Sequence, residues 1–256
     1  MLKPRIIPCL LVKNKGLVKS VNFKSHKYLG DPINAVRIFN EKQVDELMIL
    51  DIDATAEKRG PDFKTIEYWA SQCRMPLCYG GGITTVEEAK IIFGLGVEKI
   101  AISSAAITNP SLVPQIADKV GSQSVIVVMD VKKNKQGLYE IFTHNGEVAT
   151  GLSPFDFAKQ MQELGVGEIV VNSIDNDGVM KGYDINLIDQ VRKSISVPMT
   201  VLGGAGSLND IGELISKYKI IGASAGSLFV FKGVYKAVLI NYPNPSEKKA
   251  LIQKYF

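Results

Sequence analysis

Residues 46–53 read Glu-Leu-Met-Ile-Leu-Asp-Ile-Asp, and residues 168–175 read Glu-Ile-Val-Val-Asn-Ser-Ile-Asp. Both are short apolar runs bounded by acidic residues, as expected of strands buried on both faces of a parallel sheet. The shift of 122 residues that superposes them also aligns a proline, two glycines and a hydroxyl residue of each half, namely Pro76, Gly81, Gly82 and Thr85 with Pro198, Gly203, Gly204 and Ser207. The repeat predicts two fused halves of similar structure.

Eight apolar, β-branched runs in all alternate with helical patterns, which is the order expected of a parallel sheet with crossover helices. The expected strands are residues 5–11, 46–51, 76–79, 99–103, 124–130, 168–172, 198–202 and 220–224. Eight such units in 256 residues predict one α/β domain, residues 1–256, folded as a single (β/α)8 TIM barrel with a half-barrel internal repeat.

Helix-start signals agree with this register. Asp31-Pro32 and Ser153-Pro154 each place a capping side chain before a proline, and Thr85-Val-Glu-Glu88 has the spacing of a capping box. After the fifth expected strand, residues 138–143 and 147–149 flank Asn145-Gly146, which predicts a hairpin on the rim that carries the active site.

The composition is that of a folded chain that binds small molecules. Hydrophobic residues make up 46%, and 30 Lys and Arg against 26 Asp and Glu give a net charge of only +4, so nucleic acid is not expected as a partner and a small anion is. Residues 1–11 are too short and too charged for a signal peptide or membrane span, so no membrane contact and a cytoplasmic location are expected.

Cysteine and histidine are scarce. Cys9, Cys73 and Cys78 lack metal-ligand spacing, and their odd number argues against a disulfide framework. His26 and His144 are the two histidines of the sequence, which leaves little for a zinc site or a Ser-His-Asp triad. No metal and no cofactor are therefore predicted.

Glycines and serines follow four of the expected strands, where barrel enzymes often bind phosphate. One set is Gly203, Gly204, Gly226 and Ser227, and the repeat supplies Gly81, Gly82, Ser103 and Ser104. Glycine lets backbone N–H groups approach a phosphate, although for any one of these glycines a tight strand-to-helix turn is the better explanation. Two matching sets on opposite sides of the rim favour an elongated bisphosphate.

Carboxylates end several strands. Asp130 ends the fifth, where it could act as a general acid or base, although a lone aspartate there is more often a helix cap. Asp51, Asp53, Asp175 and Asp177 lie at equivalent depth on the second and sixth strands. Their convergence on one mouth favours chemistry or polyol recognition.

A lysine-rich stretch follows the first strand, with Gly16 and Gly30 near its ends. Its lysines are Lys13, Lys15, Lys19, Lys24 and Lys27. The pattern suits a mobile loop that closes over an anion, and a solvated charged loop is the alternative.

Charged residues begin four strands at the opposite end. Arg5, Glu46, Lys99 and Glu168 alternate in sign around the base, where a stabilising salt-bridge plug is the default interpretation. Next to this ring along the strands lie small or apolar residues that could line a path for a neutral molecule, namely Cys9, Met48, Cys78, Ala101 and Val170.

Together these residues resemble the cyclase subunit of imidazole glycerol phosphate synthase along almost the whole chain. The matching segments are Arg5-Ile-Ile-Pro-Cys9, Gly30-Asp-Pro32, Asp45-Glu-Leu47, Gly80-Gly-Gly-Ile83, Ser104-Ala-Ala106, Asn109-Pro110, Thr150-Gly151, Asp175-Asn-Asp-Gly178, Gly182-Tyr-Asp184 and Gly203-Gly-Ala-Gly206.

The resemblance implies a class I glutaminase docked on the amino-terminal face and ammonia that travels along the barrel axis to a bisphosphorylated substrate at the rim. It makes the four-residue charge ring an ammonia gate, with Glu98 as a docking charge beside Lys99. It makes Asp130 one of two catalytic aspartates and Lys19 the lid lysine. It also gives the two glycine and serine sets, with Asp177 and Gly178, their substrate and phosphate roles.

Two positions depart from this pattern. Leu11 stands where the family has the second catalytic aspartate, and Ser103 replaces an asparagine. Leucine cannot transfer a proton, so a mechanism that needs a pair of carboxylates loses one of them.

The altered chemistry beside an intact ring resembles the cyclase paralogue of bacterial surface-polysaccharide (O-antigen) clusters, as do Asp53-Ala-Thr and Arg59-Gly-Pro-Asp62. That resemblance implies a further partner, a sugar amidotransferase that turns an acetamido into an acetamidino group. A genuine histidine-pathway cyclase and a non-catalytic scaffold that activates the glutaminase and conducts ammonia are the alternatives.

Overall fold

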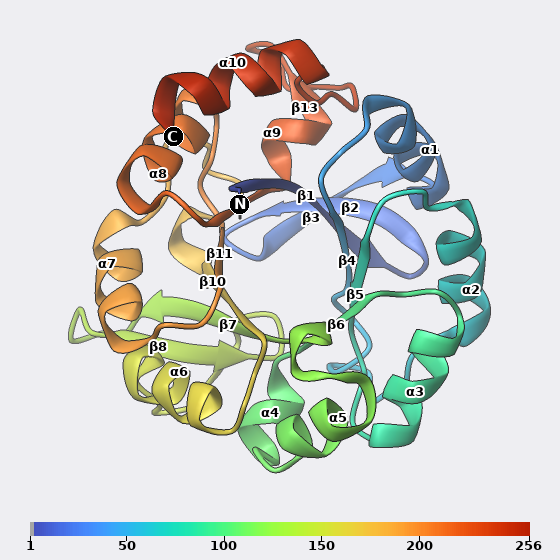
Figure 1. The fold of residues 1–256 in the computed structure, drawn as a ribbon, viewed down its shortest axis with the longest axis vertical. Helices are drawn as coiled ribbons and strands as arrows, with labels where there is room; N and C mark the ends of the chain where they lie inside the picture. Colours follow the sequence, from blue (N-terminus) through green and yellow to red (C-terminus); the bar gives the residue numbers. More distant parts are fainter. Residues whose placement is uncertain (1–2) are drawn as a thin grey trace.

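The computed structural model describes residues 3–256 and shows a closed ring of parallel strands surrounded by helices (Figure 1). The strands of the ring, in chain order, are β1 (Arg5–Lys13), β4 (Leu47–Asp51), β5 (Leu77–Gly80), β6 (Lys99–Ile102), β7 (Val125–Lys133), β10 (Glu168–Ser173), β11 (Met199–Leu202) and β12 (Gly222–Ala225). They pair in this order, with β12 beside β1 and β7 beside β10. The predicted (β/α)8 barrel is confirmed, and each ring strand lies within about three residues of its predicted range.

Helices cover the outside of the ring. The longer ones are α1 (Pro32–Lys42), α2 (Phe63–Gln72), α3 (Val86–Gly94), α5 (Leu112–Val120), α6 (Pro154–Glu163), α7 (Ile185–Ser194), α8 (Leu208–Tyr218) and α10 (Pro245–Tyr255), with short α4 (Ser104–Thr108) and α9 (Ser227–Val230) at the rim. None of the helices within residues 3–256 combines the length and hydrophobicity that crossing a membrane requires.

The predicted helix starts are confirmed. Asp31 and Ser153 accept hydrogen bonds from the first-turn N–H groups of α1 and α6. Thr85 and Glu88 form a reciprocal capping box at α3, and Ser207 begins α8 with the same motif. The sequence repeat is therefore also a repeat of local structure.

Alternate residues of each ring strand face opposite sides, because side chains of a strand alternate. On β1, Ile6, Leu10 and Val12 belong to the core between strands and helices, whereas Ile7 and Cys9 belong to a separate cluster inside the ring. This inner cluster contains Ile7, Cys9, Met48, Cys78, Ala101, Ile126, Val128, Val170 and Leu202, with Leu11 and Leu50 packed against it. All five residues predicted to line the axis are among them.

The lysine-rich stretch is folded differently from the irregular loop predicted. It forms β2 (Gly16–Val21) and β3 (Lys24–Gly30), which extend β1 as an antiparallel sheet. Two-residue turns at Asn14-Lys15 and Asn22-Phe23 have positive φ angles, which match the twist of a hairpin. Figure 1 shows this lid hairpin, residues 16–30, across the centre of the ring of helices.

Two further hairpins decorate the barrel. The predicted one is confirmed as β8 (Tyr139–Thr143) and β9 (Val148–Ala149), and β8 pairs with the end of β7. A second, β13 (Phe231–Lys232) and β14 (Ala237–Val238), precedes α10. Tyr242 then donates a hydrogen bond to the Ile6 carbonyl, and Lys248 of α10 pairs with Asp45 at 2.6 Å, which fixes this last segment to the base of the ring.

Gly167, in the turn before β10, provides a test of the barrel's close packing. A Cβ there would lie 2.7 Å from Gln123 Cα and closer still to the Ser122 carbonyl oxygen, so Gly167→Ala should lower the free energy of unfolding by about 1–3 kcal/mol. Gly94→Ala is the matched control, because its Cβ would meet no atom within 4 Å and alanine favours a helix. Urea denaturation of both variants measures this, and equal midpoints would contradict it.

Candidate active site at the carboxyl ends of the strands

A pocket open to solvent lies at the carboxyl ends of the ring strands. Its floor is formed by four members of the inner apolar cluster, which are Cys9, Ala101, Val128 and Leu202. Its polar walls include Lys19, Ser20, His26, Asp51, Ser103, Ser104, Asp130, His144, Asn145, Asn172 and Asp177. The pocket is therefore apolar below and polar above.

Asp130 projects from β7 onto this floor, beside β10. Asn172 of β10, its register partner, donates a hydrogen bond of 2.8 Å from Nδ2 to Asp130 Oδ1. The pKa of Asp130 is raised to about 6, chiefly by burial. Nearby Asp177 also raises this pKa, whereas the hydrogen bond from Asn172 lowers it. A carboxyl group with a pKa this near neutrality can both accept and donate a proton.

Leu11 occupies the corresponding place on β1. It lines the pocket, is partly buried and packs against the inner cluster. Its register partners are Leu50 of β4 and Val18 of the lid hairpin. The β1 side of the floor is therefore apolar.

Of the lysines in the lysine-rich stretch, Lys19 lines the pocket. It is 5% exposed, and its ammonium donates a hydrogen bond of 2.8 Å to the Cys9 carbonyl. Burial lowers the pKa of Lys19. The ammonium also lies directly against Gly226, where a Cβ would collide with it.

The lid hairpin docks on the segment after β10. Ser20 Oγ donates to Asp177 Oδ2 at 3.2 Å, and Asn22 donates to the backbone carbonyls of Ile174, Asp175 and Asp177. Burial raises the pKa of Asp177, although Lys19 and Ser20 act to lower it. The hairpin thus covers the sixth-strand side of the mouth.

The two predicted glycine and serine sets differ in how many of their residues line the pocket. Gly81, Gly82, Ser103 and Ser104 all line the pocket. In the other set only Gly226 does, whereas Gly203, Gly204 and Ser227 lie outside the pocket walls, as does Gly178. Gly178 lies against the backbone of Ser20 in the lid hairpin.

Other predicted acidic and basic residues pair with one another. Lys13 lies 3.3 Å from Asp53, and Lys15 lies 2.7 Å from Asp62. Arg59 lies 3.4 Å from Asp51, whose Oδ1 also accepts from the backbone N–H groups of Asp53 and Ala54. Asp51 also lines the pocket. Asp175 is exposed and accepts a hydrogen bond from the Lys133 backbone.

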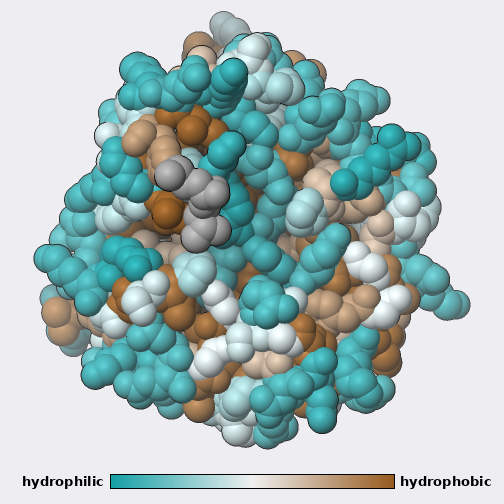
Figure 2. All heavy atoms as spheres, viewed as in Figure 1, coloured by the Kyte–Doolittle hydropathy of each residue, from teal (hydrophilic) through white to brown (hydrophobic). Residues whose placement is uncertain are grey.

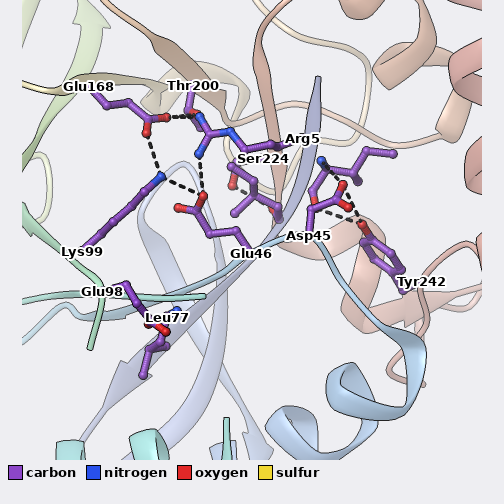
Figure 3. A network of polar contacts seen from close by, with 12 residues as sticks. Arg5, Asp45, Glu46, Leu77, Glu98, Lys99, Glu168, Thr200, Ser224 and Tyr242 are labelled. Atoms are coloured by element: carbon purple, nitrogen blue, oxygen red, sulfur yellow. Dashed lines mark hydrogen bonds and ion pairs between the residues drawn. The ribbon is translucent and has the colours of Figure 1, made fainter. Parts of the chain in front are cut away.

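The four predicted base residues form one closed network (Figure 3). Arg5 contacts both Glu46 and Glu168, and Lys99 contacts the same two carboxylates at 2.8 and 3.1 Å. Both glutamates are at most 5% exposed. Burial alone would raise the pKa of Glu168, but Arg5 and Lys99 hold it below the ordinary value, so the carboxylate is ionised.

Sequence reasoning missed two polar residues of the inner face. Thr200 donates to Glu168 and accepts from Arg5 at 3.5 Å, so it belongs to the base network. Asn172 holds Asp130. Counting in steps of two from Glu168 would have placed Asn172 inside the ring. Glu98 is exposed, and one of its oxygens accepts a hydrogen bond from the Leu77 backbone.

Fold and site define a (β/α)8 barrel with a polar mouth, an apolar inner layer and a closed ion-pair ring at its base. Residues 5–236 match the family described as "Histidine biosynthesis protein". The chain is 56% identical to the "Putative imidazole glycerol phosphate synthase subunit hisF3" of Vibrio vulnificus, over 99% of this chain and 98% of that protein.

Two other relatives match over similar lengths. The subunit named hisF2 of Pseudomonas aeruginosa, also "putative" in its name, is 50% identical over 95% of this chain and 97% of its own. The imidazole glycerol phosphate synthase subunit HisF of Natranaerobius thermophilus is 39% identical over 94% and 96%. The chain belongs to the HisF family of imidazole glycerol phosphate synthase subunits.

The raised pKa of Asp130 predicts how stability depends on pH. The ionised carboxylate destabilises the fold as pH rises from the ordinary value of 3.8 through about 6. Asp130→Asn should therefore match the wild type near pH 4 and exceed its free energy of unfolding at pH 8 by up to about 3 kcal/mol. Urea denaturation across this range measures the difference, and a difference independent of pH would contradict the assignment.

Proposed function

We propose that this chain is the synthase subunit of a glutamine amidotransferase complex, which receives ammonia at its base and delivers it to a phosphorylated acceptor at its mouth. The observation that carries the proposal is the intact ion-pair ring beneath a mouth in which Leu11 takes the place of a family carboxylate. The base keeps the family's apparatus, and the cyclisation site is changed.

The inner apolar layer supports transfer along the axis. Between the pocket floor and the ring lie Ile7, Met48, Cys78, Ile126 and Val170, all of them buried. Neutral ammonia crosses such a layer far more easily than ammonium or hydroxide, because burying a charge is expensive. The ring is closed in this structure, so Arg5 or Lys99 must shift for ammonia to pass.

A class I glutaminase is the partner that we propose for the amino-terminal face. Hydrophobic patches lie between hydrophilic side chains on the face that Figure 2 shows, as in many interfaces. Arg5 and Lys99 keep 28% and 19% of their side chains exposed there. A docked subunit would contact both cations and bias their positions.

The acceptor that we propose is an acetamido sugar, whose acetamido group becomes an acetamidino group with a separate ATP-dependent sugar amidotransferase, as in surface polysaccharides. Gly81, Gly82, Ser103 and Ser104 would hold a phosphate group on the open side of the mouth. Asp130 and Lys19 would be the proton-transferring and anion-binding groups.

Imidazole glycerol phosphate synthesis is the second candidate. Asp130, Asp177 and Lys19, to which the family resemblance gives catalytic and substrate-binding roles, all line the pocket. The relative from Natranaerobius thermophilus carries the plain name of that enzyme subunit. A third candidate, a scaffold that only conducts ammonia, requires an empty mouth. Soaking with inorganic phosphate tests it, because rim loops empty at high concentration would favour the scaffold.

Leu11→Asp separates the first two candidates. Purified chain with ammonium and the family's bisphosphorylated nucleotide substrate should be nearly inactive, and Leu11→Asp should raise the rate by about a hundredfold by restoring the carboxylate pair. Leu11→Asn is the control of equal shape without an ionisable group. Substantial wild-type turnover would support the histidine-pathway candidate and exclude our proposal.

Lys99→Ala tests the ring. Mixing the chain with its cognate glutaminase should stimulate glutamine hydrolysis, and Lys99→Ala should change this stimulation at least about threefold, because it removes charge-assisted hydrogen bonds to Glu46 and Glu168. Lys90→Ala, which breaks an exposed pair with Glu87, is the control. Circular dichroism verifies folding. Absence of association at micromolar concentrations would rule out the complex.

A further inference from the structure

One of the two polar groups of the Asn172 carboxamide makes a hydrogen bond to the protein. Nδ2 donates to Asp130 at 2.8 Å, whereas Oδ1 accepts no hydrogen bond from the described residues. Asn172 is 4% exposed, so its carbonyl oxygen is removed from bulk water without a protein partner. A buried acceptor left without a donor destabilises the fold, which makes it unusual.

The hydrogen bond to Asp130 fixes the orientation of this amide. Only the NH2 group can donate to a carboxylate oxygen, so a flip would set two acceptors against each other. The pKa of Asp130 being near 6, the carboxylate form dominates at neutral pH. Oδ1 is therefore held in place as an acceptor.

Asn172 Oδ1 lies close to Gly203, the residue after β11, where a Cβ would come within 2.9 Å of it. Asn172 also lines the main pocket. The group that meets Oδ1 must be a hydrogen-bond donor, since a phosphate oxygen would be repelled.

The place of Asn172 on β10 connects it to the base. Glu168 lies in the ion-pair ring, Val170 in the inner apolar layer and Asn172 at the mouth, all on the inward side of one strand. A molecule that moves from the base along the inner face of β10 passes Val170 and then reaches Asn172 Oδ1, beside Asp130.

We propose that Asn172 is a substrate-binding residue whose Oδ1 accepts an N–H group and holds the reacting nitrogen beside Asp130. Two sources supply this chemistry, which are ammonia from the axis and an amide N–H of the acceptor. The assignment deepens the proposed function and rests on it for the identity of the nitrogen. Asn172 gives the mouth a preference for groups that donate a hydrogen bond.

Solution NMR of the isolated full chain tests the site without glutaminase or turnover. The side-chain NH2 signal of Asn172 is assigned by its loss in Asn172→Leu, and the signal of Asn176 serves as an internal reference, because that residue bonds the Gly182 carbonyl outside the pocket. Titrations use two matched pairs of probes, acetamide with N,N-dimethylacetamide and ammonium with tetramethylammonium.

We expect at least one N–H probe to shift the Asn172 signal and to bind at least about fivefold more tightly than its methylated counterpart, because pairing Oδ1 is worth about 1 kcal/mol or more. Response to ammonium alone identifies the axis as the source, and response to acetamide alone identifies the acceptor. Equal binding of methylated and unmethylated probes, or no response of Asn172, would overturn the proposal.

Comparing methylated with unmethylated probes on the wild-type chain tests the proposal even where Asn172→Leu folds poorly. Asn172→Asp supplies a second variant for the assignment, because it also removes the side-chain NH2 signal. If the probes bind as expected while the glutaminase does not associate, Asn172 keeps its assignment and the ammonia-transfer function fails.

Discussion

The closed ring of eight parallel strands is the constraint on which the rest depends. Closure through the pairs β1–β12 and β7–β10 leaves each strand one inward and one outward face, so every second residue points to the axis. On β10 this produces the column Glu168, Val170 and Asn172, and on β1 the column Arg5, Ile7, Cys9 and Leu11. Base, inner layer and mouth are consecutive levels of the same strands.

The buried carboxylates at the base and at the mouth of the barrel have opposite electrostatic surroundings. Glu46 and Glu168 lie between two cations, and removing one partner from such a buried network typically destabilises by about 3–5 kcal/mol. Asp130 has an amide neighbour and no cation paired with it among the described residues, so burial raises its pKa. Glu168 at the base is thereby held ionised, whereas Asp130 at the mouth can change its protonation state near neutral pH.

The sequence predicted what depends on local pattern. The eight ring strands follow from apolar runs, and the starts of α1, α3 and α6 follow from Asp31, Thr85 and Ser153, because caps act within one turn. The ring of four charges followed from their common place at strand starts. These signals lie within a few residues of the structure that they specify.

What failed depends on how segments pair and pack with one another. The lid hairpin was predicted as a loop, because Lys19, Lys24 and Lys27 hide a weak strand pattern that becomes stable only on pairing with β1. The covering of Gly178 by Ser20 and of Gly226 by Lys19 follows from that hairpin's position. Asn172 was missed because its role is defined by Asp130, forty-two residues earlier.

The substitution at position 11 changes what the mouth can do. With leucine there, the β1 side of the floor has no ionisable group, and the hydrogen-bond partner of Asp130 on the floor is a neutral amide. A single carboxyl group of near-neutral pKa moves one proton at a time, in either direction, whereas ring closure by acid and base together requires two groups. An amide acceptor beside that carboxyl suits the addition of a nitrogen nucleophile, in which N–H groups must be held and one proton removed. Under the function that we propose, the mouth performs narrower chemistry than a cyclase and receives its nitrogen from the base.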